Sequence, residues 1–272
     1  MMTLNIEDEL AKMVVQLWKL GAKSQYSAKK TDYMHETFGK LLLLSAEQLN
    51  LPINNSLEYQ TKFEYKVAGK RSIKSIRKNW QVPCFWGETF SLDAVLVNKL
   101  DNNIIYPDEV DRFERDIHNS IDTIYLFKAQ LTGYNQNRFN AANNLVGEIM
   151  RVFAHPSNRN KRVCFINIVP NATVANNSQK ERTYTAVRPL CLSKKDSPGI
   201  PLQELPIDSW IKNQIDEINI YYDLNFGGDF KSQCADWDSL VREQNNFVTI
   251  DPNSIEVMNN YILKLSKRLS HK

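Results

Sequence analysis

Apolar residues recur at helical spacing in four stretches of the chain. The first predicts a helix over residues 5–21, because Asn5 can cap it, acidic residues follow at once and Gly21 can end it. Its apolar positions return every three or four residues, which predicts one buried face. The same spacing predicts three further helices, over residues 31–50, 138–153 and 253–269.

Other segments are short and either alternating or almost continuously apolar, which is typical of β-strands. The predicted strands cover residues 92–98, 103–106, 124–132, 162–170, 182–190 and 218–226. Residues 107–122 are polar and rich in acids, and we expect them to be partly helical. This order of elements predicts an α/β (α+β) fold, with a central mixed sheet of five to six strands flanked by helices.

The length of 272 residues fits one large domain or two small ones, and we expect a single domain over residues 1–272. Within it, residues 1–60 are expected to hold the N-terminal helices. Residues 61–170 are expected to form the candidate catalytic core with a basic segment at 62–80, and residues 171–272 the C-terminal strands and helix.

Composition argues against several classes of protein. No stretch approaches the roughly 18 consecutive apolar residues that span a bilayer, and the first ten residues carry acids where a signal peptide carries bases. We therefore expect a cytoplasmic protein with no membrane partner. The four cysteines form no CxxC pair and the four histidines no HxxxH motif, which argues against a disulfide framework and a zinc hydrolase.

Two charged residues stand in otherwise apolar strands. Asp93 opens one strand, and Lys128 interrupts another. Burying a lysine in mid-strand is costly unless a partner or a solvated cleft receives it, and Asp93 is a natural partner. A carboxylate and a lysine on adjacent strands can also bind a divalent metal and orient a water, as phosphodiester hydrolysis requires. Alternatively, Lys128 reaches solvent from an edge strand and Asp93 caps a turn.

The segment after Lys128 is dense in side chains that contact phosphates and base edges. At a strand-to-helix junction, helix N-terminal amides would also face an anion. The predicted DNA contacts here are Thr132, Tyr134, Asn135, Gln136, Asn137, Arg138 and Asn140. The alternative is that the asparagines only form turns.

Residues 62–78 hold seven cations and a single acid, Glu64, and the aromatic residues Trp80, Phe85 and Trp86 follow. Such a segment can follow a phosphate backbone. The predicted DNA contacts are Lys70, Arg71, Lys74, Arg77 and Lys78. A solvated basic face is the alternative.

A helix with Glu36, a strand with Asp93, the strand IYLFKAQ and an amphipathic helix together resemble the core of the PD-(D/E)XK nuclease superfamily, and most of all its type II restriction endonucleases. The resemblance covers roughly residues 30–170. It implies that Asp93 binds magnesium, that Lys128 positions and polarises the attacking water, and that Glu36 is an auxiliary acid.

One position departs from the family pattern, because Leu126 stands two residues before Lys128 where the family has an acid. The missing carboxylate could come from another element, with Glu148 or Glu36 as donor. Alternatively the register shifts by two, so that Gln130 takes the lysine position and Lys128 stands where a metal ligand should be, as in an inactive form.

A third possibility replaces Asp93 by Asp108, which follows Pro107 directly. We prefer Asp93, because AVLV after it is strand-like and EVDRFERD after Asp108 is not. The first two possibilities stay open.

The expected function is a magnesium-dependent endonuclease that cuts double-stranded DNA at a specific site. The resemblance implies products with a 3′-hydroxyl and a 5′-phosphate, and a homodimer that matches a palindromic target. One alternative is a non-cleaving DNA-binding protein of the same fold. Another is an α/β protein-interaction module with no nucleic-acid role, in which Asp93 and Lys128 form a structural ion pair.

Overall fold

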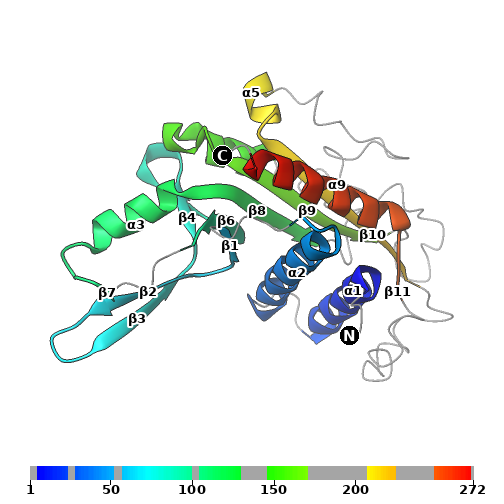
Figure 1. The fold of residues 1–272 in the computed structure, drawn as a ribbon, viewed down its shortest axis with the longest axis horizontal. Helices are drawn as coiled ribbons and strands as arrows, with labels where there is room; N and C mark the ends of the chain where they lie inside the picture. The colour runs from blue at the N-terminus through cyan, green and yellow to red at the C-terminus, as the bar shows by residue number, and fades with distance from the viewer. Residues whose placement is uncertain are drawn as a thin grey trace.

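The computed structural model describes residues 5–23, 28–51, 57–99, 104–129, 146–170, 207–224 and 248–270. A curled six-stranded sheet runs through this part of the chain in the order β1-β6-β8-β9-β10-β11 (Figure 1). Its strands are β1 (Leu57–Gln60), β6 (Ala94–Asn98), β8 (Ile121–Ala129), β9 (Arg162–Pro170), β10 (Ile215–Leu224) and β11 (Val248–Ile250). The pairs β8–β9 and β9–β10 are parallel, and the other three are antiparallel.

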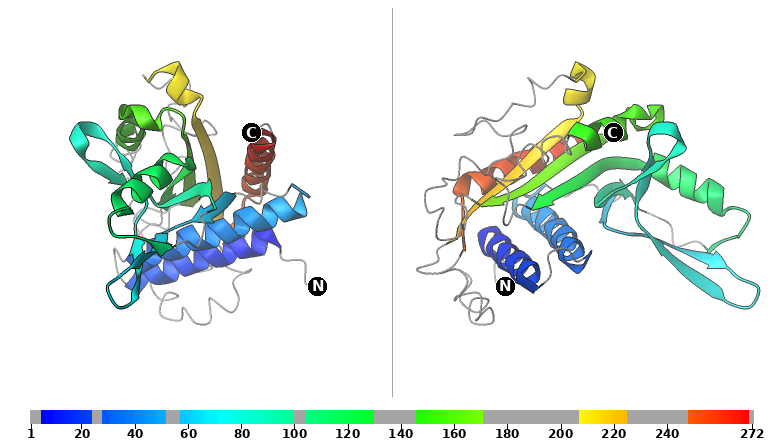
Figure 2. Two further views of the ribbon diagram at one scale, coloured as in Figure 1. Left: turned by 60° about the vertical axis from the view of Figure 1, so that its left-hand side comes forward. Right: turned by 180° about the vertical axis from the view of Figure 1, so that it is seen from behind.

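Three long helices cover one face of this sheet. They are α1 (Ile6–Lys23), α2 (Ala28–Gln48) and α9 (Pro252–Leu269), and Figure 2 shows α1 and α2 side by side. Tyr125 and Phe127 of β8 point to this face and join a core that includes Phe38 of α2 and Ile262 of α9. The face is apolar because alternate residues of the central strands all project toward the helices.

The opposite face carries a second apolar core. Ile124 and Leu126 of β8 point to it and pack with Ile149 and Phe153 of the helical segment 146–154. Shorter elements complete this side: α3 (Val110–Asn119), α5 (Ser209–Lys212), and the 3-10 turns η1 (Phe85–Gly87) and η2 (Pro156–Asn158). Because both faces are covered, the central strands are almost continuously apolar.

Two smaller sheets extend the molecule at the end away from β11 (Figure 1). One has the order β3-β2-β7, formed by β2 (Phe63–Ala68), β3 (Ile73–Lys78) and β7 (Ile104–Ile105). The other pairs β4 (Gln81–Pro83) with β5 (Thr89–Ser91). The sequence pattern predicted neither β2 nor β3, because alternating cations obscured their apolar positions.

Most predicted elements are present in the structure. The mixed sheet, its central strands, the α1, α2 and α9 helices and the partly helical insertion at α3 are confirmed. The predicted strand 182–190 and the first part of the predicted helix 138–153 lie outside the described residues. Within the described residues, no helix is both long enough and apolar enough to cross a membrane.

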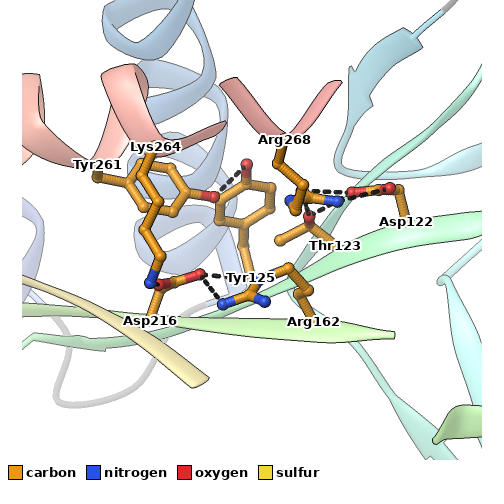
Figure 3. A network of polar contacts seen from close by, with 8 residues as sticks. All are labelled: Asp122, Thr123, Tyr125, Arg162, Asp216, Tyr261, Lys264 and Arg268. Carbon is orange, nitrogen blue, oxygen red and sulfur yellow. Dashed lines mark hydrogen bonds and ion pairs between the residues drawn. The ribbon is translucent and has the colours of Figure 1, made fainter. Parts of the chain in front are cut away.

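The α9 helix is attached to the sheet by the polar contacts in Figure 3. Arg268 donates to Asp122 Oδ2 at 2.8 Å and to Thr123 Oγ1 at 3.0 Å. Lys264, about one turn before Arg268, contacts Asp216. About two turns before Arg268, the Tyr261 hydroxyl donates to the buried Tyr125 hydroxyl at 3.0 Å. These side chains set the position of α9 along β8 and β10, because their partners lie on those two strands.

The α2 helix crosses β1 at Gly39, which positions the residues one turn earlier. A Cβ on Gly39 would lie 2.3 Å from two ring carbons of Tyr59, far inside van der Waals contact. The Tyr59 hydroxyl donates to the backbone carbonyl of His35 at 2.8 Å, so the same ring also holds the preceding turn of α2. Burial raises the pKa of Tyr59 well above its usual value.

We therefore expect Gly39→Ala to lower the free energy of unfolding by about 1–3 kcal/mol, because the rigid ring has to move. The matched control is Gly147→Ala, another helical glycine, where an added Cβ meets nothing within 4 Å. That change should be neutral or stabilise by up to about 1 kcal/mol. Urea unfolding followed by circular dichroism measures both, and equal stability of the two variants would contradict the close approach.

Candidate active site

Asp93 lies where the β6–β8 ladder ends. Ala94, the first residue of β6, pairs with Tyr125 at this end of the ladder. Beyond it, the Asp93 side chain takes the place of a backbone partner, and Oδ2 accepts the Phe127 N–H at 2.9 Å. The carboxylate stays 37% exposed, so it is held by the strand and still open to solvent. This arrangement leaves Oδ1 available for another contact.

His35 of α2 faces that second oxygen. Its Nε2 lies 3.9 Å from Asp93 Oδ1, and its ring packs on Phe127 with centroids 4.6 Å apart. Burial lowers the pKa of His35 below its usual value, against the opposing effect of the Asp93 carboxylate. A neutral imidazole therefore borders the carboxylate on the α2 side.

Lys128 does not pair with Asp93 but with Glu148, so the predicted Asp93–Lys128 ion pair is wrong. The two atoms Lys128 Nζ and Glu148 Oε1 are 2.5 Å apart. Lys128 is the second-last residue of β8, and Glu148 belongs to the helical segment 146–154, which packs on the same face of the sheet. Glu148 is the nearer carboxylate because the helix passes directly over the end of the strand.

The environment of the Glu148 carboxylate is unusual in two respects. Its Oε2 is buried and has no hydrogen-bond partner in the described part of the chain. Burial raises the pKa of Glu148, Lys128 lowers it, and the nearby Asp93 carboxylate raises it further. The two carboxylates are therefore close enough to interact, with Lys128 beside them.

These residues fit a magnesium ion only in part. Among the described residues, no group of three or more His, Cys, Asp or Glu side chains is arranged to hold a metal. Magnesium, however, is usually bound by one or two carboxylates together with substrate phosphates and waters. Asp93 and the unpartnered Oε2 of Glu148 are carboxylate oxygens of the kind that such a shared ion binds.

A row of amides continues from Lys128 across the sheet. In the parallel ladders Lys128 lies opposite Asn167, and Asn167 lies opposite Asn219. Asn167 donates to Asn219 Oδ1 at 2.9 Å, and Asn219 in turn donates to Glu217 Oε1. Burial raises the pKa of Glu217 to about 8, against the opposing effect of the Asn219 hydrogen bond. The row of polar side chains that begins at Lys128 therefore ends at Glu217, a carboxyl group that favours its protonated form.

This pKa predicts a pH-dependent loss of stability. The pKa of Glu217 is higher in the folded chain, about 8, than its ordinary value of 4.5, so the folded state holds the proton more tightly. The stabilisation is complete below about pH 4.5 and declines as the pH rises through about 8. Glu217→Gln should remove this decline and be more stable than the wild type at pH 8 by at most a few kcal/mol, since each unit corresponds to about 1.4 kcal/mol.

Urea unfolding at pH 5 and pH 8 measures this effect. Glu256→Gln, at an exposed position of α9, is the matched control and should keep the wild-type pH dependence. If Glu217→Gln also kept the wild-type pH dependence of stability, the raised pKa of Glu217 could not be its cause.

The remaining predicted site residues fall in different places. Glu36 is exposed on α2 next to His35, and it makes no contact with Asp93 or Lys128 in the described structure. Leu126 is 2% exposed in the second core. Asp108 is exposed in the turn before α3, while β6 follows Asp93, so the expected strand after Asp93 is confirmed. Gln130 and the predicted contacts at 132–140 lie outside the described residues.

The basic segment forms β2 and β3, and its cations divide into two groups. Arg77 pairs with Glu64 at 2.8 Å, and Lys78 pairs with Glu114 at 2.5 Å. Lys70, Arg71 and Lys74 are exposed and make no ion pair with a described residue. Trp80, expected beside a phosphate backbone, is instead fully buried next to Phe63, with ring centroids 4.9 Å apart. It belongs to the second core, together with Phe63 and Val82.

Sequence patterns missed His35, Asn167 and Asn219. Asn167 had a detectable signal, as the one amide inside an almost continuously apolar strand. His35 had none, because its importance depends on the crossing of α2 over the end of β8. No family model matches the chain, and no curated protein or solved structure matches it either.

Proposed function

We propose that the chain is a magnesium-dependent endonuclease that cuts double-stranded DNA at a specific site. The observation that carries this proposal is the meeting of Asp93, Glu148 and Lys128 at one end of β8. Glu148 supplies, from a separate helix, the carboxylate that the Leu126 position lacks. The order of helix, antiparallel strands, helix and parallel strand also agrees with the resemblance to the PD-(D/E)XK nucleases.

In this proposal the chain's own residues position the phosphate and the attacking water. Asp93 and Glu148 would hold the magnesium ion, which supplies Lewis-acid chemistry when bound. Lys128 presents an ammonium group to the negative charge that develops during attack. A bond forms between the water oxygen and phosphorus, and the bond from phosphorus to the 3′ oxygen breaks. The attacking water gives up one proton to solvent, and the departing 3′ oxygen takes up one proton from solvent. The products are a 3′-hydroxyl and a 5′-phosphate.

The neutral His35 would act as a positioning residue for Asp93. It faces Asp93 Oδ1 from α2, and the Asp93 side chain keeps 37% of its surface exposed for substrate. A homodimer with a palindromic site and a cytoplasmic location complete the proposal, since most soluble oligomers have twofold symmetry.

A non-cleaving DNA-binding protein is the second candidate. The observation in its favour is Leu126, which is buried where the family pattern has a metal ligand. A protein-interaction module is the third, and it is favoured by the Lys128–Glu148 ion pair, because that pair satisfies the lysine without any ligand.

Incubation of the purified protein with supercoiled and linear DNA, with magnesium or with a chelator, tests the three candidates. Discrete magnesium-dependent fragments are the expected result. Salt-sensitive binding without cutting would favour the second candidate, because phosphate contacts make affinity fall steeply with salt. If the protein neither cuts nor binds DNA, the nuclease proposal is overturned and the third candidate remains.

A further inference from the structure

β2 and β3 form the antiparallel pair of the sheet β3-β2-β7, hereafter the β2–β3 ribbon, with its turn at residues 69–72. β7 lies beside Lys66 and Val67 of β2. The Gly69 N–H donates to the Ser72 carbonyl at 2.9 Å and closes the turn. A Cβ on Gly69 would lie 2.5 Å from that carbonyl oxygen, so this close approach requires glycine. The turn therefore presents Lys70 and Arg71 at its apex.

The charge of the ribbon is concentrated toward this apex. Residues 66–74 contain four cations and no acid. Lys66, Lys70, Arg71 and Lys74 are all exposed and make no ion pair with a described residue. The cations at the base are neutralised instead, as in the pair of Lys78 with Glu114. This division is not expected of a uniformly solvated basic face.

The two faces of the ribbon differ as well. Phe63 and Tyr65 point to the second core and attach the ribbon to the body of the molecule. Lys66 lies opposite Ser75, and Lys74 lies opposite Val67, so these two lysines project from opposite faces. Ile73, next to the apex, is 56% exposed and lies between Arg71 and Lys74 in the sequence, with Ser72 directly before it. An exposed apolar side chain among free cations suits a polyanion that also offers apolar contacts.

We infer that the β2–β3 ribbon enters the major groove of double-stranded DNA, an inference that rests on the proposed function. The groove is about 12 Å wide and admits a two-stranded ribbon, which describes the end of β2–β3 from Ala68 to Ile73, beyond the pairing with β7. Lys66 and Lys74 contact phosphates on its two walls. Arg71 reads a guanine edge from the apex, which suits a bidentate guanidinium, and Ile73 contacts a thymine methyl group.

Two variants separate phosphate contacts from base reading. Lys66→Ala/Lys74→Ala removes two phosphate contacts, so the slope of log affinity against log salt should fall by about 2. Lys70→Arg/Arg71→Lys keeps the charge and moves the guanidinium by one residue. It should keep the salt slope, lower affinity for the preferred duplex about 10- to 100-fold and change the preferred base at one position.

Binding is measured in a chelator with a randomised DNA duplex pool, sequenced after selection, and with double-stranded RNA as competitor. Lys267→Ala, which removes an exposed cation of α9, is the control and should leave slope and preference unchanged. If the wild type binds or cuts DNA and both ribbon variants behave like Lys267→Ala, the ribbon inference fails and the proposed function stands. If the wild type binds no DNA, both the ribbon inference and the proposed function are overturned. If it prefers the double-stranded RNA competitor, the assignment of the ribbon to the DNA major groove is overturned.

Discussion

Asp93→Asn is expected to abolish magnesium-dependent cleavage of DNA, with a loss of at least about 100-fold, while salt-sensitive binding to DNA is retained. Changing residues that only support a metal ligand already costs about 10- to 100-fold, and loss of a ligand's charge should cost more. The amide is the informative replacement because its oxygen still accepts the Phe127 N–H, now made by Asp93 Oδ2 at 2.9 Å. Asp93→Ala would lose that hydrogen bond and confound activity with folding.

Asp108→Asn provides the matched control. It makes the same chemical change at an exposed turn residue, which is the alternative aspartate of the sequence motif. Cleavage by this variant should equal that of the wild type. If Asp108→Asn were inactive and Asp93→Asn active, the candidate site would be misplaced. Loss of folding in Asp93→Asn, seen by circular dichroism, would point to a structural role of the carboxylate.

Lys128→Met is expected to lower the rate of cleavage about 10²- to 10³-fold, as does the loss of one group that stabilises charge in a transition state. Methionine keeps the length of the aliphatic side chain and leaves Glu148 without its ion-pair partner, Lys128 Nζ, now 2.5 Å away. The control is Lys12→Met, because Lys12 makes a Lys–Glu pair of the same length with Glu9 on α1. Single-turnover cleavage measures both variants, and only Lys128→Met should be slow.

Lys128→Glu distinguishes the two interpretations of the motif: a replacement carboxylate from Glu148, or a register shift that places Lys128 at the position of the acid. Where Glu148 is the replacement carboxylate, a glutamate at position 128 faces a second carboxylate, and cleavage should be lost as in Lys128→Met. In the shifted register, the wild type would be inactive and Lys128→Glu would gain magnesium-dependent cleavage. An active wild type together with an active Lys128→Glu variant would show that Lys128 has no part in the reaction.

Local sequence predicted the elements that carry the site more accurately than the contacts within it. We expected β6, β8 and β9 because a strand that is buried on both faces is apolar at nearly every position. Such a run, bounded by turns, can be recognised in the sequence. Asp93 and Lys128 were noticed for the same reason, as charges in apolar strands. β2 and β3 were missed because their outward positions hold cations and only one face is apolar.

The pattern of apolar and polar residues was enough to predict the class of fold, the central strands and the two charged positions at their ends. That Lys128 pairs with Glu148, 20 residues away, and that His35 borders Asp93 could be seen only in the folded chain. Hydrophobic periodicity specifies which side of an element is buried, and no more than that. Which charges then meet depends on strand register and on where a helix crosses the sheet, and neither is encoded in any single segment.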